Sequence, residues 1–277
     1  MTIQIIPFDE NLLPQAAALL AERHRRDRSA LPHLPRRFGE IDAAQQALDI
    51  VWAKPHAAGF ASMEGGRLSA FLLGDRVIDD QRGRSAWVRN AGYAYSAGTS
   101  PDVIRDLYAA LGETWVANGV FTHYALISLA DAELLHAWYS LSFGIEQVHA
   151  LLDLTQIGEA GAPIPGIDLR RAVSGDEPHL ASMSDVIWRE QVKTPVWGAM
   201  MPESVSEVEK GWASLATDAD CKTWLAMDGD TPVGVQVYWP AEAGNDTLHV
   251  EEDCIHLGVA GTRVAERGRG IAIWMTQ

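Results

Sequence analysis

The residues best suited to chemistry lie near the end of the sequence, in the segment Arg267-Gly268-Arg269-Gly270-Ile271-Ala272. The apolar residues that follow predict that a helix begins at this glycine-rich turn. A helix N-terminus offers unpaired backbone N–H groups and the positive end of the helix dipole, which together suit a phosphate. The glycines let a phosphate approach the backbone, and the arginines can donate charge-assisted hydrogen bonds. The segment therefore predicts a phosphate site; the alternative is an ordinary strand-to-helix turn with surface arginines.

A second reactive group precedes this turn, in a run that alternates in the manner of a strand. Ile255, Leu257 and Val259 would share one face, and Glu252, Cys254 and His256 the other. Imidazole exchanges protons near neutral pH, so His256 is the first candidate for a general base and Glu252 the second. The alternatives are a hydrogen-bonded sheet histidine and a solvated carboxylate.

Two other chemistries fit this run less well. Cys254 and His256 would lie side by side, but no third group is present to orient them for covalent catalysis, so we interpret Cys254 as a small buried residue. A metal site would also need His249, which alternation sends to the opposite face. The sequence therefore predicts no metal.

The elements that position these residues belong to a repeat. Ile3 and Ile167 open similar strands 164 residues apart, and the same separation joins Met63 and Met227 at the turns of two predicted hairpins. Equal separations and the same order of elements indicate a tandem duplication. A loop rich in glycine and proline marks the seam. We expect an N-terminal domain over residues 1–155, a linker over 156–166 and a C-terminal domain over 167–277.

Each repeat reads β-α-α-β-β-β-α-β-α-β, and in the second copy the fourth strand leads directly into the glycine turn. In this order of elements the chain resembles the GCN5-related N-acetyltransferase superfamily, in a tandem two-domain form. The most specific shared element is the acyl-CoA signature Gln/Arg-x-x-Gly-x-Gly/Ala, which Arg267, Gly270 and Ala272 fill. The resemblance implies an α/β fold with mixed sheets, the second domain being truncated after its fourth strand.

The resemblance also implies an activity, in which an acetyl group passes from acetyl-CoA to an amine by direct attack in a ternary complex. The cofactor residues that it implies are Thr262, Arg263, Val264, Arg267, Gly268, Arg269, Gly270, Ile271 and Ala272. The base often comes from the fourth strand, ten or eleven residues before the signature, which again leads to His256, with Glu252 second. Backbone N–H groups near Gly261 and Thr262 would stabilise the oxyanion. The acceptor is a small molecule or a peptide; a non-catalytic acyl-CoA-binding or sensing protein and a purely structural protein are the alternatives.

The first repeat lacks the signature. At a separation of 164, Gly270 falls on Asp106 and Ala272 on Tyr108, and a carboxylate there would repel a pyrophosphate. We therefore expect a structural or substrate-shaping domain with a degenerate cofactor site. The general acid that the resemblance implies is a tyrosine on the next helix, which would lie beyond Gln277. Projecting the first repeat onto the second places its end about 41 residues later, so a truncated second repeat is expected.

Composition narrows the possible partners. The net charge of −15 argues against a nucleic-acid backbone as partner, because phosphates need a basic surface. The arginine-rich stretch from Arg23 to Arg37 is interpreted as a solvated helix end, with an anion-binding patch as the alternative. The sequence has no apolar run of membrane-spanning length, and it has two cysteines, so a cytoplasmic protein without a disulfide framework is expected. The oligomeric state is left open.

Overall fold

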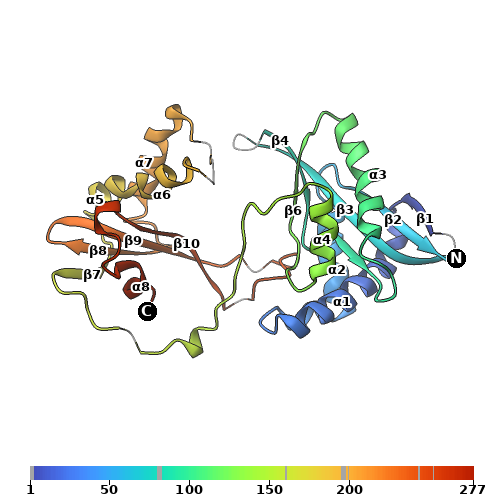
Figure 1. Cartoon of the computed structure of the whole chain (residues 1–277), viewed down its shortest axis with the longest axis horizontal. Coiled ribbons are helices and arrows are strands. Elements are labelled where there is room, and N and C mark those ends of the chain that lie inside the picture. Colours follow the sequence, from blue (N-terminus) through green and yellow to red (C-terminus); the bar gives the residue numbers. More distant parts are fainter. Residues whose placement is uncertain are drawn as a thin grey trace. The chain divides into compact units, whose positions relative to one another are not determined.

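The computed structural model describes residues 3–79, 83–159, 161–194, 198, 200–242, 244–251 and 253–277. The chain forms two compact units (Figure 1). Unit 1 comprises Met1–Leu151 together with Glu242–Glu252, and unit 2 comprises Leu152–Ala241 together with Asp253–Gln277. Within the described ranges, no helix is both long enough and apolar enough to cross a membrane.

Unit 1 is built on a mixed sheet in the order β1-β2-β3-β4-β6, with β5 paired to β3. The pairs are antiparallel except for β4 with β6, which are parallel. The elements of the unit are β1 Ile3–Pro7, α1 Leu13–Ala30, α2 Ile41–Trp52, β2 Ala58–Glu64, β3 Arg67–Asp79, β4 Gly83–Val88, β5 Tyr93–Tyr95, α3 Val103–Ala117, β6 Thr122–Ala125 and α4 Ala132–Ser140. One apolar core lies under α1 and α2, and a second, with the buried Trp115 and Trp138, lies under α3 and α4 (Figure 1).

Several arginines of α1 donate hydrogen bonds to backbone carbonyls of unit 1, so they do not form a free basic patch. Arg23 is 2% exposed, and its Nη1 donates to the carbonyls of Tyr93 (2.6 Å) and Asn90 (2.8 Å). Arg26 donates to the carbonyl of Tyr95 and Arg28 to that of Leu34. The expectation of a merely solvated helix end was therefore wrong for Arg23: its charge satisfies carbonyls that the sheet leaves unpaired.

Unit 2 is a smaller antiparallel sheet in the order β10-β9-β8-β7. Its elements are β7 Ile167–Arg171, α5 Glu177–Met183, α6 Asp185–Gln191, α7 Val205–Ser214, β8 Lys222–Asp228, β9 Thr231–Pro240, β10 Ile255–Thr262 and α8 Ile271–Thr276. The core on one face contains residues of α5 and α7, and α8 packs on the other face (Figure 1). As far as the described residues extend, β10 is the edge of the sheet. The α/β fold, with a mixed sheet in unit 1 and a shorter second domain, is thus confirmed.

The sheet pairings place the two repeats in a more accurate register than sequence spacing does. Residues Ala70 and Gly234 keep the separation of 164, but Ala70 pairs with Tyr95 and Gly234 pairs with Thr262, which are 167 apart. The second unit therefore has three more residues than the first between these two paired positions. In this register Gly270 corresponds to Val103, so the expected clash of a pyrophosphate with Asp106 does not apply.

Two strands differ from their expected positions. The last strand in the expected element order of the first repeat falls on residues Ile145 to Leu154, and it does not form. Val148, Ala150, Leu152 and Leu154 alternate and would share one face of a strand, but these side chains are exposed. The fourth strand of the second predicted repeat begins at Ile255. Most of the intervening segment, Glu242–Glu252, belongs to unit 1.

Candidate functional site

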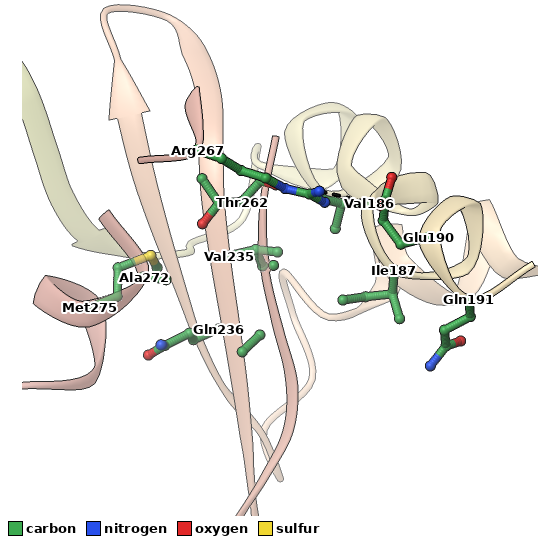
Figure 2. A pocket seen from close by; sticks show the side chains of 12 residues that line it. Val186, Ile187, Glu190, Gln191, Val235, Gln236, Thr262, Arg267, Ala272 and Met275 are labelled. Atoms are coloured by element: carbon green, nitrogen blue, oxygen red, sulfur yellow. Dashed lines mark hydrogen bonds and ion pairs between the residues drawn. The ribbon is translucent and has the colours of Figure 1, made fainter. Parts of the chain in front are cut away.

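The candidate site is a cavity of about 430 Å³ in unit 2, which follows the edge strand β10 between α6 and α8. Figure 2 shows side chains from both helices around it. It is lined by Val186, Ile187, Glu190 and Gln191 of α6, Val235 and Gln236 of β9, Ala260, Gly261 and Thr262 of β10, and Arg267, Ala272 and Met275. The cavity thus brings together the fourth strand of the repeat and the predicted phosphate turn.

Two glycines set the walls of the cavity. A Cβ on Gly261 would lie 2.7 Å from a methyl carbon of Val186, so glycine at this position lets α6 approach β10. A Cβ on Gly234 would lie 2.9 Å from the sulfur of Met275, so glycine also lets α8 approach β9. The backbone of β10 is consequently close to α6 and that of β9 is close to α8, which is a usual reason for glycine inside a strand.

A bulge at Gly258 changes which residues of β10 share a face. His256 pairs with Trp239, and Val259 pairs with Val237, with a register shift between Leu257 and Val259. Because directly paired residues point to the same face, His256 and Val259 share a face and Leu257 lies on the other. The predicted grouping of Leu257 with Val259 was therefore wrong, and a single extra residue is the reason.

Of the two predicted catalytic residues, the structure describes only His256. His256 is exposed near the start of β10 and does not line the cavity, and its side chain has no hydrogen-bond partner among the residues that the structure describes. Glu252 lies outside the described residues. Cys254 is a free, partly exposed thiol.

The glycine turn has the backbone that the sequence predicts. Gly268 and Gly270 both have φ of 82°, in the left-handed region, and a Cβ on either would meet nothing within 4 Å. Gly270 caps α8, and Ile271 is buried against the sheet at 1% exposure. The space beside the turn is therefore open, and its glycines are required by backbone conformation.

The arginines of the turn are held by carboxylates. Arg267 Nη1 lies 3.2 Å from Glu190 Oε2 (Figure 2). Arg269 Nη1 contacts Glu266 and lies 3.3 Å from Asp228 Oδ2, and these hydrogen bonds raise the pKa of Arg269. Hydrogen bonds from Lys193 and then Arg267 lower the pKa of Glu190. Both arginines are thus oriented by acidic partners, which an anionic ligand would have to replace.

Arg263 and Val264 lie away from this cavity. Arg263 Nε donates to the carbonyl of Pro232 (2.6 Å), and its Nη2 donates to the carbonyl of Ser182 (3.0 Å). The side chain therefore ties α5 to the start of β9. Val264 is 64% exposed, and both residues line a neighbouring cavity of about 510 Å³ beside α6.

The polar wall of the cavity contains Gln236, which the sequence did not single out, and Thr262, which it did. Gln236 is 2% exposed; its Nε2 donates to Thr276 Oγ1 (2.9 Å), and its Oε1 accepts from the Tyr238 hydroxyl (2.7 Å). Thr262 Oγ1 is shielded from solvent without a partner among the described residues. In the sequence, Gln236 could have been found as the glutamine in the mainly apolar strand β9. Within the same described ranges, no group of three or more His, Cys, Asp or Glu side chains could hold a metal.

Comparisons with known proteins found no matching family model and no matching curated protein. Several solved acetyltransferase structures are similar to the chain. The ribosomal-protein-alanine N-acetyltransferase of Brucella melitensis biovar Abortus is 11% identical, covers 55% of this chain and 99% of its own, and has a TM-score of 0.41. A predicted acetyltransferase with acetyl-CoA from Clostridium acetobutylicum is 9% identical, covers 57% and 100%, and has a TM-score of 0.42.

A third structure spans both units. It is a GCN5-related glucosamine N-acetyltransferase region of a fungal multi-domain β-N-acetylglucosaminidase, 14% identical, with a TM-score of 0.49. The match covers 99% of this chain and 33% of the fungal chain. These likenesses concern the fold alone.

Proposed function

We propose that unit 2 binds acetyl-CoA and transfers its acetyl group to an amine. The observation that carries this proposal is the continuity of the site: the cavity along the edge strand β10 leads to a turn in which Gly268 and Gly270 hold left-handed backbone beside open space. A ligand with an extended arm and a pyrophosphate matches both parts.

The turn suits the pyrophosphate. No Cβ obstructs Gly268 or Gly270, so phosphate oxygens can approach the backbone N–H groups directly. Arg267 and Arg269 stand on either side of Gly268, and their guanidinium groups can exchange exposed carboxylate partners for phosphate. Because exposed ion pairs are weak, this exchange costs little.

The edge of β10 suits the acyl arm. The arm of CoA contains two amide groups, and an extended amide chain can add to the unpaired edge of a sheet as a further strand would. Ala260, Gly261 and Thr262 present that edge to the cavity. The Thr262 hydroxyl, which has no partner among the described residues, supplies a polar contact there.

The transfer itself needs a base and an oxyanion site. The amine nitrogen forms a bond to the acetyl carbon, the carbon–sulfur bond breaks, and the thiolate leaves and takes up a proton. The proton lost by the amine passes to His256 directly or through water, with Glu252 as the second candidate. Backbone N–H groups near Gly261 and Thr262 are proposed to stabilise the oxyanion.

A non-catalytic acyl-CoA-binding protein is the second candidate, and one observation favours it: His256 does not line the cavity. Free-thiol release from acetyl-CoA with a panel of primary amines separates the two functions. Transfer predicts thiol release that depends on an amine and falls about 100-fold in His256→Gln. Binding without amine-dependent release would favour the sensing protein, and unchanged release in His256→Gln would remove His256 as the base.

A further inference from the structure

Two polar side chains of the cavity lie on the same face of the sheet in unit 2. Gln236 of β9 pairs with Ala260 of β10, and two residues further along β10 Thr262 pairs with Gly234. Because directly paired residues share a face, and so do alternate residues of one strand, Gln236 and Thr262 point to the same side. This is the side of β9 on which Figure 2 shows Met275 of α8. Diagonal neighbours of this kind lie about 7–8 Å apart, so a small polar group can be held between them.

The hydrogen bonds around Gln236 have a fixed direction. The Thr276 hydroxyl donates to the carbonyl of Ala272 (2.9 Å), so toward Gln236 it can only accept. Gln236 Nε2 therefore faces Thr276 (2.9 Å), and Gln236 Oε1 accepts from the Tyr238 hydroxyl (2.7 Å). The amide of Gln236 cannot be turned over without losing the hydrogen bond with Thr276.

One N–H of Gln236 remains without a protein partner. A primary amide has two N–H groups, and among the described residues only the group that faces Thr276 is bonded. Gln236 is 2% exposed, so solvent has little access to the remaining N–H. Thr262 Oγ1 is likewise shielded from solvent, with no partner within the described ranges. Burial of a polar group without a partner is costly, and a ligand in the cavity would supply the missing partners.

We propose that Gln236 is a specificity-determining residue for the acyl donor, and that its second N–H donates to the carbonyl oxygen of an amide in the donor's arm. The Thr262 hydroxyl accepts from the N–H of the same amide. The cavity wall around these two groups is apolar, with Ala260, Ala272 and Met275, so the two polar contacts determine which chemical group is bound there.

This inference rests on the proposed function and deepens it. The arm of CoA contains two amides, so one can pair with the edge of β10 while Gln236 and Thr262 bind the other. Recognition of the arm is thereby assigned to β9, whereas the pyrophosphate is assigned to the turn after β10. The two parts of the ligand can consequently be tested separately.

The test uses two probes, acetyl-CoA and the nucleotide half of CoA, which carries the pyrophosphate but lacks the arm. Calorimetry gives the Kd of each probe for wild type, Gln236→Met and Tyr238→Phe. Methionine has a similar volume and no N–H group. Tyr238→Phe is the matched control, because it removes the other hydrogen bond of Gln236 and leaves Thr276 to orient the amide. Far-UV circular dichroism checks that each variant folds. Gln236→Asn, whose amide has a shorter reach, replaces Gln236→Met if the latter does not fold.

We expect Gln236→Met to raise the Kd for acetyl-CoA about three- to tenfold, the effect of one hydrogen bond, and to leave the Kd for the nucleotide half within about twofold. Tyr238→Phe should leave both values within about twofold. An unchanged Kd for acetyl-CoA in Gln236→Met, an equal rise for both probes, or the same rise in Tyr238→Phe would overturn this inference alone. Failure of the wild type to bind acetyl-CoA would instead overturn the proposed function, and this inference with it.

Discussion

Glu190 Oε2 lies 3.2 Å from Arg267 Nη1, so a carboxylate of α6 contacts the arginine that opens the predicted acyl-CoA signature. Glu190 also accepts a hydrogen bond from Lys193 (2.7 Å). Both Glu190 and Arg267 line the cavity. The proposed phosphate site therefore contains its own carboxylate, and a bound phosphate would compete with Glu190 for the same guanidinium group.

Replacement of Glu190 should strengthen cofactor binding. In Glu190→Gln the charged competitor is gone while the shape of the side chain is kept, so the Kd for acetyl-CoA should fall about two- to fivefold at low ionic strength. Calorimetric titration measures the change. Glu209→Gln, an exposed glutamate on α7, serves as the control for net charge. A Kd that rises in Glu190→Gln, or falls equally in both variants, would show that Glu190 does not compete.

Each chain should bind one molecule of acetyl-CoA. The pairing register places Tyr93 and Tyr95 of unit 1 where unit 2 has Ala260 and Thr262, which line the cavity. Both tyrosines are buried; the Tyr93 hydroxyl accepts from the N–H of Ser128 (2.8 Å), and the Tyr95 hydroxyl donates to the carboxylate of Asp131. The equivalent space of unit 1 is therefore filled. A calorimetric stoichiometry of two would contradict this account.

The stability of unit 1 should depend on pH through His24. Burial lowers the pKa of His24 to about 4, and its Nε2–H donates to the carbonyl of Pro35 (2.6 Å). His24 therefore stays neutral in the folded protein at pH values where the unfolded chain already binds a proton, below about pH 6.5. The contribution of His24 to the free energy of unfolding is complete above that pH. It falls as the pH is lowered from 6.5 to 4, by an amount on the order of 3 kcal/mol.

Urea unfolding of the wild type and His24→Gln at several pH values between 4 and 7.5 tests this prediction. The glutamine keeps a donor for the Pro35 carbonyl and does not titrate, so the free energy of unfolding should depend less on pH in the variant. Identical slopes in the two proteins would assign the pH dependence to other groups.

Much of the fold was predictable because it depends on local patterns and on the repeat. The hairpins follow from alternation around glycine turns, and Gly229 and Gly65 do adopt left-handed backbone. The phosphate turn was predictable for the same reason, since Gly268 and Gly270 are needed wherever φ is positive. These features depend on a few adjacent residues, which the sequence displays directly.

The remaining features depend on distant partners. The bulge at Gly258 follows from the ring of Trp239, which a Cβ on Gly258 would approach within 2.5 Å, and alternation alone does not show it. Leu248 looks like an ordinary strand residue in the sequence, yet it is buried in unit 1. The carboxylate partners of Arg267 and Arg269 come from α6 and β8. Such contacts emerge only from the folded chain.

The central claim is that acetyl-CoA binds at the turn between β10 and α8, and calorimetric titration of wild type and Gly270→Asp in parallel tests it most directly. Gly66→Asp is the matched control, because Gly66 also has positive φ and open space but lies at the β2–β3 turn of unit 1. We predict saturable binding to the wild type and Gly66→Asp, and none to Gly270→Asp, with unchanged far-UV circular dichroism in all three. Undiminished binding to Gly270→Asp, or no binding to the wild type, would contradict the account.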